Sequence, residues 1–244
     1  MHKGIPQKIQ ILRFIAEQGI VSVKDVNDYF FTQDKTKLIL STLYQLGLNR
    51  MWYFNVSGGL WQISDPKLYR LLKAYYPDLA GMKVGHVSFH LAPHYLELNR
   101  VRTVIEKSDK VELVKWLSER MLRALPAEER AELCPSRVPD AVFWVVTKDG
   151  GQKKFFLECE RHLNSTPQRY REVFESYFWR QDARDNNVIF LCGNERIQRR
   201  LIAIESKMFL RCSAQFVTLE GLYRKYSACT QEPQAKLEPA AEAV

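Results

Sequence analysis

Two apolar runs on either side of a glycine-containing turn predict a long β-hairpin between residues 138 and 161. The first run extends from Ala141 to Val146, the second extends from Phe155 to Leu157, and the turn contains the sequence Lys-Asp-Gly-Gly. Glycine supplies the positive φ that tight hairpin turns require, and the runs consist largely of strand-forming residues. We therefore treat this hairpin as the element around which the rest of the chain is arranged.

Three acidic residues mark one end of the predicted hairpin. Asp140 precedes the first strand, and Glu158 and Glu160 end the second. Since side chains alternate along a strand, the two glutamates share one face, whereas Leu157 and Cys159 point the other way, into a core. Three carboxylates this close repel one another unless a divalent cation lies among them, so we expect Asp140, Glu158 and Glu160 to form a metal site. The alternative is an edge hairpin whose acidic side chains are simply solvated.

Composition and charge favour a globular, intracellular protein that binds a polyanion. The 244 residues are 46% hydrophobic, and their net charge is +8. Residues 229–244 lack core-forming side chains, so we expect this tail to be disordered. Residues 230–244 carry a net charge of −2, which leaves about +10 on the folded part. Such a charge favours nucleic acid or a membrane surface as a partner.

The cysteines and the absence of long apolar runs predict a cytoplasmic location. No run approaches the roughly 18 apolar residues that span a bilayer, and the first ten residues lack the apolar core of a signal peptide, so we expect neither membrane insertion nor export. The odd number and wide spacing of the cysteines predict reduced core thiols. They are Cys134, Cys159, Cys192, Cys212 and Cys229.

The first 65 residues predict three helices followed by a second hairpin. The predicted elements are a helix over Pro6–Gln18, a short strand over Ile20–Val23, helices over Lys24–Phe31 and from Asp34 to Gly47, and strands over Arg50–Val56 and Leu60–Ile63. This order resembles a winged helix-turn-helix domain, whose third helix enters the major groove of DNA. The resemblance implies a DNA-facing set that consists of Lys35, Lys37, Ser41, Thr42, Gln45 and Arg50. The alternative is that this module packs on the next domain or dimerises through its wing.

The middle of the chain predicts a domain boundary followed by helices. We expect a linking helix over Asp65–Tyr76, a boundary over residues 77–85, a helix from His94 to Glu106, an amphipathic helix over Val111–Leu125, and a connection over Pro126–Arg137. His86, His90 and His94 are four residues apart, but Pro93 interrupts any single helix through them, so a zinc site is not favoured.

After the hairpin, helices alternate with strands. The predicted elements are a helix over Pro167–Arg180, a strand over Val188–Cys192, a basic helix over Asn194–Lys207, a strand over Phe216–Leu219 and a short final helix. The chain as a whole predicts a mixed α/β (α+β) fold with a DNA-binding domain over residues 1–76, a second domain over residues 77–228 that has helices against one mixed sheet, and the tail.

The acidic hairpin resembles the PD-(D/E)xK nuclease fold, which is the fold of many restriction endonucleases. Asp140 lies in a Pro-Asp pair before the first strand, and the second strand carries Glu158-x-Glu160. Glu160 stands where that fold usually has lysine, so Arg161, His162 or Lys154 would have to replace the lysine.

Three short motifs after a winged helix resemble the replication-relaxation group, and most of all the MOBC-class relaxases of mobilisable plasmids. The motifs are His94-Tyr-Leu-Glu-Leu-Asn99, Pro139-Asp140-Ala141 and Phe156-Leu-Glu158-Cys-Glu160-Arg161. The resemblance implies a protein that binds the transfer origin of double-stranded, supercoiled plasmid DNA and nicks one strand with Mg²⁺ or Mn²⁺. An accessory mobilisation protein and a coupling protein are the implied protein partners.

The implied catalytic set is Asp140, Glu158, Glu160, His94 and Arg161, and Arg169 and Arg171 would add DNA contacts. Tyr170 and Tyr177 are candidate nucleophiles, although aromatic residues between basic ones more often pack or contact phosphates. Two alternatives remain. The missing lysine favours a non-catalytic replication or copy-number regulator with a degenerate nuclease fold, and the third possibility is a hydrolytic nuclease of the restriction type.

Overall fold

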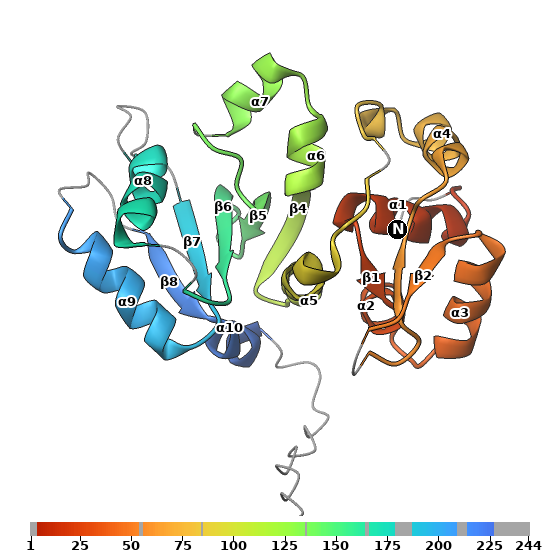
Figure 1. The fold of residues 1–244 in the computed structure, drawn as a ribbon, viewed down its shortest axis with the longest axis horizontal. Coiled ribbons are helices and arrows are strands. Elements are labelled where there is room, and N and C mark those ends of the chain that lie inside the picture. The colour runs from red at the N-terminus through yellow and green to blue at the C-terminus, as the bar shows by residue number, and fades with distance from the viewer. Residues whose placement is uncertain are drawn as a thin grey trace, which may run out of the picture.

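Two β-sheets organise the chain, and helix α5 (Ala92–Glu106) lies between them (Figure 1). The computed structural model describes residues 4–53, 56–83, 85–134, 136–163, 166–178, 187–208 and 214–226. These residues form a mixed α/β structure with one three-stranded and one five-stranded sheet, which confirms the mixed α/β part of the predicted fold. The predicted tail over residues 229–244 lies outside the described residues, as do Cys212 and Cys229.

The N-terminal part has the predicted order of helices and strands. It contains α1 (Gln7–Gln18), β1 (Val21–Ser22), α2 (Val23–Phe30), α3 (Thr36–Gln45), β2 (Asn49–Met51), β3 (Leu60–Gln62) and α4 (Pro66–Tyr75). The antiparallel sheet has the order β1-β3-β2. A capping box starts α2, since the Ser22 hydroxyl accepts from the Asp25 N–H while the Asp25 carboxylate accepts from the Ser22 N–H. Trp61 on β3 is fully buried against the apolar face of α1.

The C-terminal part is built on the five-stranded sheet. Its elements are the 3₁₀ turns η1 (Pro77–Leu79) and η2 (Phe89–Leu91), α5, β4 (Val111–Ser118), α6 (Glu119–Ala124), α7 (Ala127–Leu133), β5 (Ala141–Thr147), β6 (Gln152–Glu160), α8 (Pro167–Phe178), β7 (Asn187–Cys192), α9 (Glu195–Glu205), β8 (Gln215–Thr218) and α10 (Leu219–Tyr226). The strand order is β4-β5-β6-β7-β8, in which the β6-β7 and β7-β8 pairs are parallel and the others are antiparallel.

Helices cover both faces of this sheet. On one face, α8 and α9 bury side chains such as Phe174 and Leu201 against Phe156 and Phe190 of the strands. On the other face, α5 and α10 pack against a second cluster that includes Leu157. Consequently β6 is buried on both sides, and a carboxylate on either face of its end lies next to a helix.

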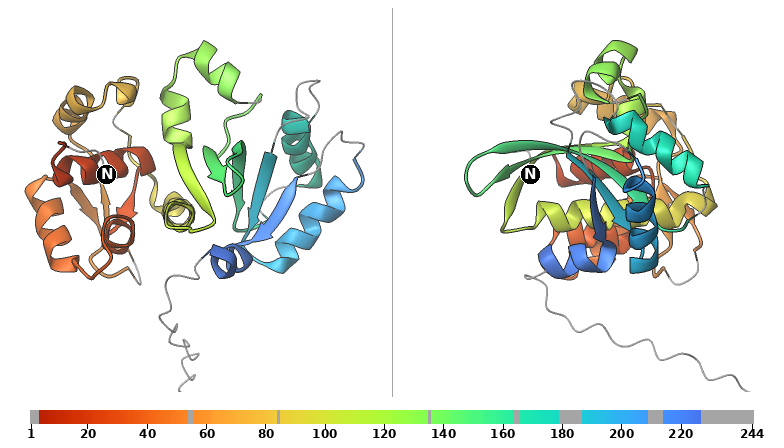
Figure 2. Two further views of the ribbon diagram at one scale, coloured as in Figure 1. Left: turned by 180° about the vertical axis from the view of Figure 1, so that it is seen from behind. Right: turned by 90° about the vertical axis from the view of Figure 1, so that its left-hand side faces the viewer.

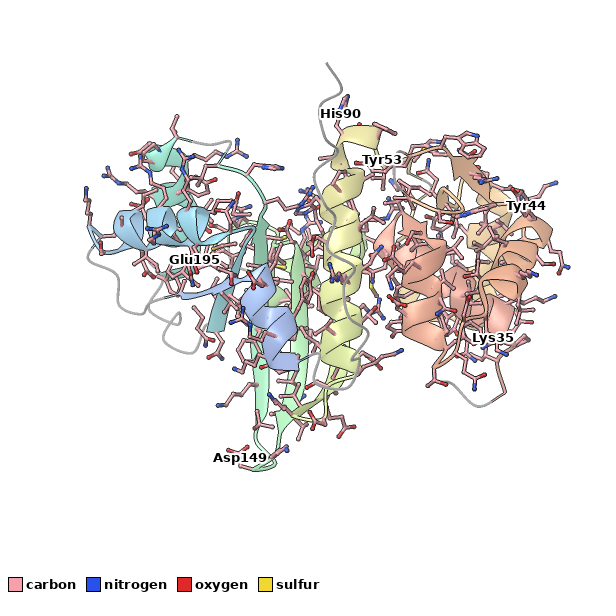
Figure 3. All side chains as sticks on the ribbon, turned by 90° about the horizontal axis from the view of Figure 1, so that it is seen from below. Lys35, Tyr44, Tyr53, His90, Asp149 and Glu195 are labelled. Atoms are coloured by element: carbon pink, nitrogen blue, oxygen red, sulfur yellow. The ribbon has the colours of Figure 1, made fainter. Side chains whose placement is uncertain are left out.

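The predicted hairpin is present and projects beyond the rest of the sheet, with Asp149 at its tip (Figures 2 and 3). Gly150 has a φ of 81° in the turn, and its N–H donates to the Thr147 carbonyl at 2.8 Å. A side chain with a Cβ would be strained at this φ, which explains why the turn contains glycine.

The predicted helix over Val111–Leu125 is wrong. Residues Val111–Ser118 form edge strand β4, and only Glu119–Ala124 are helical. A β-bulge between Leu113 and Lys115 shifts the register and leaves Val114 51% exposed. The bulge breaks the two-residue alternation that identifies a strand, so the remaining apolar spacing imitates a helix.

The N-terminal part packs directly on α5, which fits the alternative that this module docks on the next domain. The buried Arg102 guanidinium donates to the Glu17 carboxylate of α1 at 2.8 Å, and the Asn99 amide donates to the Ile20 carbonyl at 2.8 Å. In the predicted boundary over residues 77–85, Leu79 and Met82 are buried in one core cluster with side chains of α1 and α6. Lys35 and Tyr44 lie on the side of the N-terminal part that faces away from α5 (Figure 3).

Within the described residues, no helix combines the length and the apolar character that crossing a bilayer requires. Cys134, Cys159 and Cys192 are buried, unpaired thiols, as the sequence predicted for its cysteines.

Candidate active site

The hairpin register brings the three predicted carboxylates to one end of the sheet. Ala141 pairs with Leu157, and the Asp140 N–H donates to the Leu157 carbonyl at 3.1 Å, so Asp140 stands opposite Glu158. Glu158 and Glu160 end β6, which runs parallel to β7. The site therefore lies at the carboxyl edge of the parallel strands, where open α/β sheets commonly bind ligands.

Glu158 is the most buried of the three carboxylates, with 3% of its surface exposed. The Tyr177 hydroxyl of α8 donates to it, and the Arg137 guanidinium lies 3.3 Å from each of its oxygens. Burial and the nearby charge of Asp140 raise the pKa of Glu158 to about 8, although Arg137 and the Tyr177 hydroxyl oppose the shift. Glu158 therefore keeps its proton to a higher pH than an exposed carboxyl group does.

Glu160 is held by Tyr170, the other buried tyrosine of α8. The Tyr170 hydroxyl donates to Glu160 Oε2 at 3.1 Å. Burial raises the pKa of Glu160, the hydrogen bond from Tyr170 lowers it, and the charge of Asp140 raises it further, so the net shift is upward.

The two candidate nucleophiles therefore serve as hydrogen-bond donors to the site. Tyr170 and Tyr177 are both buried, and each hydroxyl donates to one glutamate. Burial and the charge of Glu158 also raise the pKa of Tyr177 well above its usual value. This arrangement favours the packing role that the sequence offered as the alternative, because a buried, protonated phenol is poorly placed to attack DNA.

Asp140 links the hairpin to α5. Its Oδ2 accepts from the Cys159 N–H at 2.7 Å, and its Oδ1 lies 3.2 Å from His94 Nε2. Burial of the imidazole opposes protonation, but the hydrogen bond to Asp140 and its negative charge outweigh burial and raise the pKa of His94. The sequence left the histidines either in ordinary hydrogen bonds or near the acidic cluster, and His94 lies beside Asp140.

Two residues that could replace the usual lysine, Lys154 and Arg161, make no described ion pair with the three carboxylates. Lys154 precedes Glu158 by four residues, about 13 Å along an extended strand, and donates to the Leu133 carbonyl instead. Arg161 directly follows β6 and makes no ion pair with any described carboxylate. Its backbone carbonyl contacts Gly193 after β7, where a Cβ would approach that oxygen to 2.7 Å.

Arg137 was missed by sequence reasoning. It precedes Asp140 by three residues, in a connection without any motif, so only the ion pair with Glu158 identifies it. Its guanidinium places a positive charge beside the acidic cluster.

The carboxylate oxygens are of the type that Mg²⁺ and Mn²⁺ prefer. Yet no three or more His, Cys, Asp or Glu side chains in the described ranges are arranged to hold a metal ion. Glu158 and Asp140 already use both of their oxygens in contacts with the protein. A cation between them would have to use the lone pairs that these contacts leave on the carboxylate oxygens.

The predicted DNA-facing residues lie on an exposed surface of the N-terminal part. Lys35, Lys37, Ser41 and Gln45 are exposed, and the last three are four residues apart and so share one face of α3. Thr42 is half-buried, and its hydroxyl donates to the Leu38 carbonyl.

Arg50 forms an aromatic cluster that the sequence did not predict. Its guanidinium donates to the Tyr44 hydroxyl at 2.6 Å and lies 4.3 Å from the centre of the Trp52 ring, and Trp52 is 79% exposed. Arg169 and Arg171, which were predicted to contact DNA, are exposed in the first turns of α8, near the acidic site.

Comparisons with known proteins find no family model, curated protein or solved structure that matches the chain. The functional argument therefore rests on the residues and their geometry.

Proposed function

We propose that this protein binds DNA through its N-terminal part and nicks one DNA strand at the acidic end of the β5-β6 hairpin. The observation that carries the proposal is the concentration of Asp140, Glu158 and Glu160 in a largely buried position, where burial and the charge of Asp140 raise the pKa of Glu158 and of Glu160. Shifts of this kind, caused by burial together with specific charged neighbours, are typical of functional sites.

Asp140, Glu158 and Glu160 are the residues that would hold Mg²⁺ or Mn²⁺. The ion, when bound, supplies Lewis acidity and a nucleophilic hydroxide. Tyr177 and Tyr170 orient the two glutamates through hydrogen bonds. His94 forms a hydrogen bond with Asp140 and acts as the group that exchanges a proton. Arg137 and Arg161 supply positive charge for the scissile phosphate.

The N-terminal part supports DNA recognition. Helix α3 presents basic and polar side chains, and Lys35 and Tyr44 lie on the side away from α5, as the third helix of a winged helix-turn-helix domain would require. The β2-β3 connection instead places Tyr53 against Phe89, with ring centroids 4.8 Å apart. A relaxase that acts at the transfer origin of supercoiled plasmid DNA, with an accessory mobilisation protein and a coupling protein as partners, is the form of this activity that the sequence motifs favour.

The decisive test incubates the protein with supercoiled plasmid carrying the DNA that flanks its gene, with and without Mg²⁺ or Mn²⁺. We expect wild-type protein to nick this plasmid only with metal. Asp140→Asn should reduce nicking by about a hundredfold or more, since even partners of metal ligands contribute roughly 10–100-fold. Glu112→Ala, which removes an exposed carboxylate on edge strand β4, should not change the rate. Equal nicking by wild type and Asp140→Asn would refute the assignment of the site.

A non-catalytic DNA-binding regulator is the second candidate. It is favoured by the ion pair of Glu158 with Arg137, which engages one of the three candidate metal ligands. Tight binding of origin DNA without nicking under any metal condition would select this candidate.

A further inference from the structure

A basic groove between α8 and α9 adjoins the acidic site. It has a volume of about 680 Å³. Its lining comprises Leu163, Pro167, Tyr170, Ala203, Ile204 and three arginines of α9, Arg196, Arg199 and Arg200. Neither the predicted DNA-facing set nor the acidic site uses these arginines.

The three arginines are not neutralised by any described carboxylate. All three are exposed, and they occupy one face of α9 because they are three and four residues apart. Two exposed arginines on other helices pair with a glutamate four residues earlier, Arg123 with Glu119 and Arg224 with Glu220. Arg199 follows Glu195 by the same interval, yet its Nε–H reaches only the Glu195 backbone carbonyl, at 3.4 Å. Within the described residues, the groove therefore carries three positive charges that no ion pair offsets.

Tyr170 connects the groove to the acidic site. Its ring lines the groove, and its hydroxyl donates to Glu160 at 3.1 Å. Helix α9 also begins at the carboxyl edge of β7, just after the close contact between Gly193 and Arg161. Glu195 marks this end of α9 in Figure 3. An anionic chain in the groove would therefore reach the carboxylates without leaving the surface of α8 and α9.

We infer that the α8-α9 groove binds the sugar-phosphate backbone of a single DNA strand next to the acidic site. The choice of ligand rests on the proposed function. Arg196 to Arg200 span only about 6 Å of helix, so the charge is concentrated on a short stretch of one backbone rather than spread along a duplex. The apolar side chains of Leu163, Pro167 and Ile204 offer contacts for sugars and unstacked bases.

The test compares two double variants of the full chain that lose the same charge. Arg196→Gln/Arg200→Gln removes groove arginines, and Arg123→Gln/Arg224→Gln removes paired arginines on other helices. Affinity for a fluorescent single-stranded oligonucleotide and for the matching duplex is measured by anisotropy over a salt series in EDTA, with thermal melts to verify folding.

We expect the groove variant to lose about tenfold or more in single-strand affinity, and its slope of log K against log salt to become shallower by about 1.4, because each lost phosphate contact removes about 0.7. The control variant should keep the wild-type slope, and duplex affinity should change less than single-strand affinity. Equal losses in both variants, or a loss confined to duplex DNA, would overturn the inference. Because binding in EDTA requires no cleavage, a failure here is distinct from a failure to nick plasmid.

Discussion

The pKa of Glu158 makes a prediction about stability that does not depend on catalysis. This carboxyl group has a pKa of about 8 in the folded protein, against an ordinary value of 4.5. Between these values the folded state binds more protons than the unfolded state, so stability is greatest at low pH and falls as pH rises toward 8, by at most about 1.4 kcal/mol per pH unit. The raised pKa values of Glu160 and His94 act with the same sign.

Glu158→Gln removes the titrating group while keeping its shape and an acceptor for Tyr177. In EDTA, we expect its free energy of unfolding to depend less on pH between 5 and 8 than that of wild type, and to be higher than wild type at pH 8. Urea titrations at several pH values measure both quantities. An unchanged pH dependence would show that Glu158 is ionised throughout this range.

The two buried tyrosines distinguish hydrolysis from covalent catalysis. If a metal-bound hydroxide attacks DNA, Tyr170→Phe and Tyr177→Phe should each retain most of the nicking activity. Tyr177→Phe should still cost about 1–3 kcal/mol of stability, because the buried Glu158 loses a donor. A stable protein-DNA adduct mapped to either tyrosine by mass spectrometry would instead establish a tyrosine nucleophile.

At the scale of elements, a buried ion pair joins helix α5 to α1 of the N-terminal part. Arg102 of α5 donates to Glu17 of α1, and Glu17 also pairs with Arg13. Arg102→Met should destabilise the protein by about 3 kcal/mol, at the lower end of the range for broken buried pairs because Arg13 remains. Arg123→Met, which breaks the exposed pair with Glu119, should cost less than about 1 kcal/mol. Thermal or urea unfolding compares the two, and equal effects would argue that the α1-α5 contact does not hold the parts together.

Local pattern explains which elements the sequence could predict. The β5-β6 hairpin was predictable because its strands are apolar on both faces and its turn requires glycine, and its register then placed Asp140 opposite Glu158. Strand β4 could not be predicted from the sequence, because its bulge removes the alternation that identifies a strand. Arg137 and the arginine groove depend on contacts between distant segments, which no local pattern encodes.

At the scale of the whole molecule, the net positive charge and the exposed face of α3 predict duplex binding that is steeply salt-dependent. Lys35 lies on the side away from α5 (Figure 3), and Lys37 is exposed in the first turn of α3. If both contact phosphates, Lys35→Ala/Lys37→Ala should weaken binding to every duplex sequence and make the slope of log K against log salt shallower by about 1.8, since each contact contributes about 0.9.

The matched control is Lys148→Ala/Lys153→Ala, which removes two exposed lysines near the tip of the β5-β6 hairpin. Anisotropy titrations of both variants with origin and unrelated duplexes measure the slopes. If the tip variant loses as much as the α3 variant, duplex binding reflects the charge of the molecule as a whole, and α3 is not its DNA-binding helix.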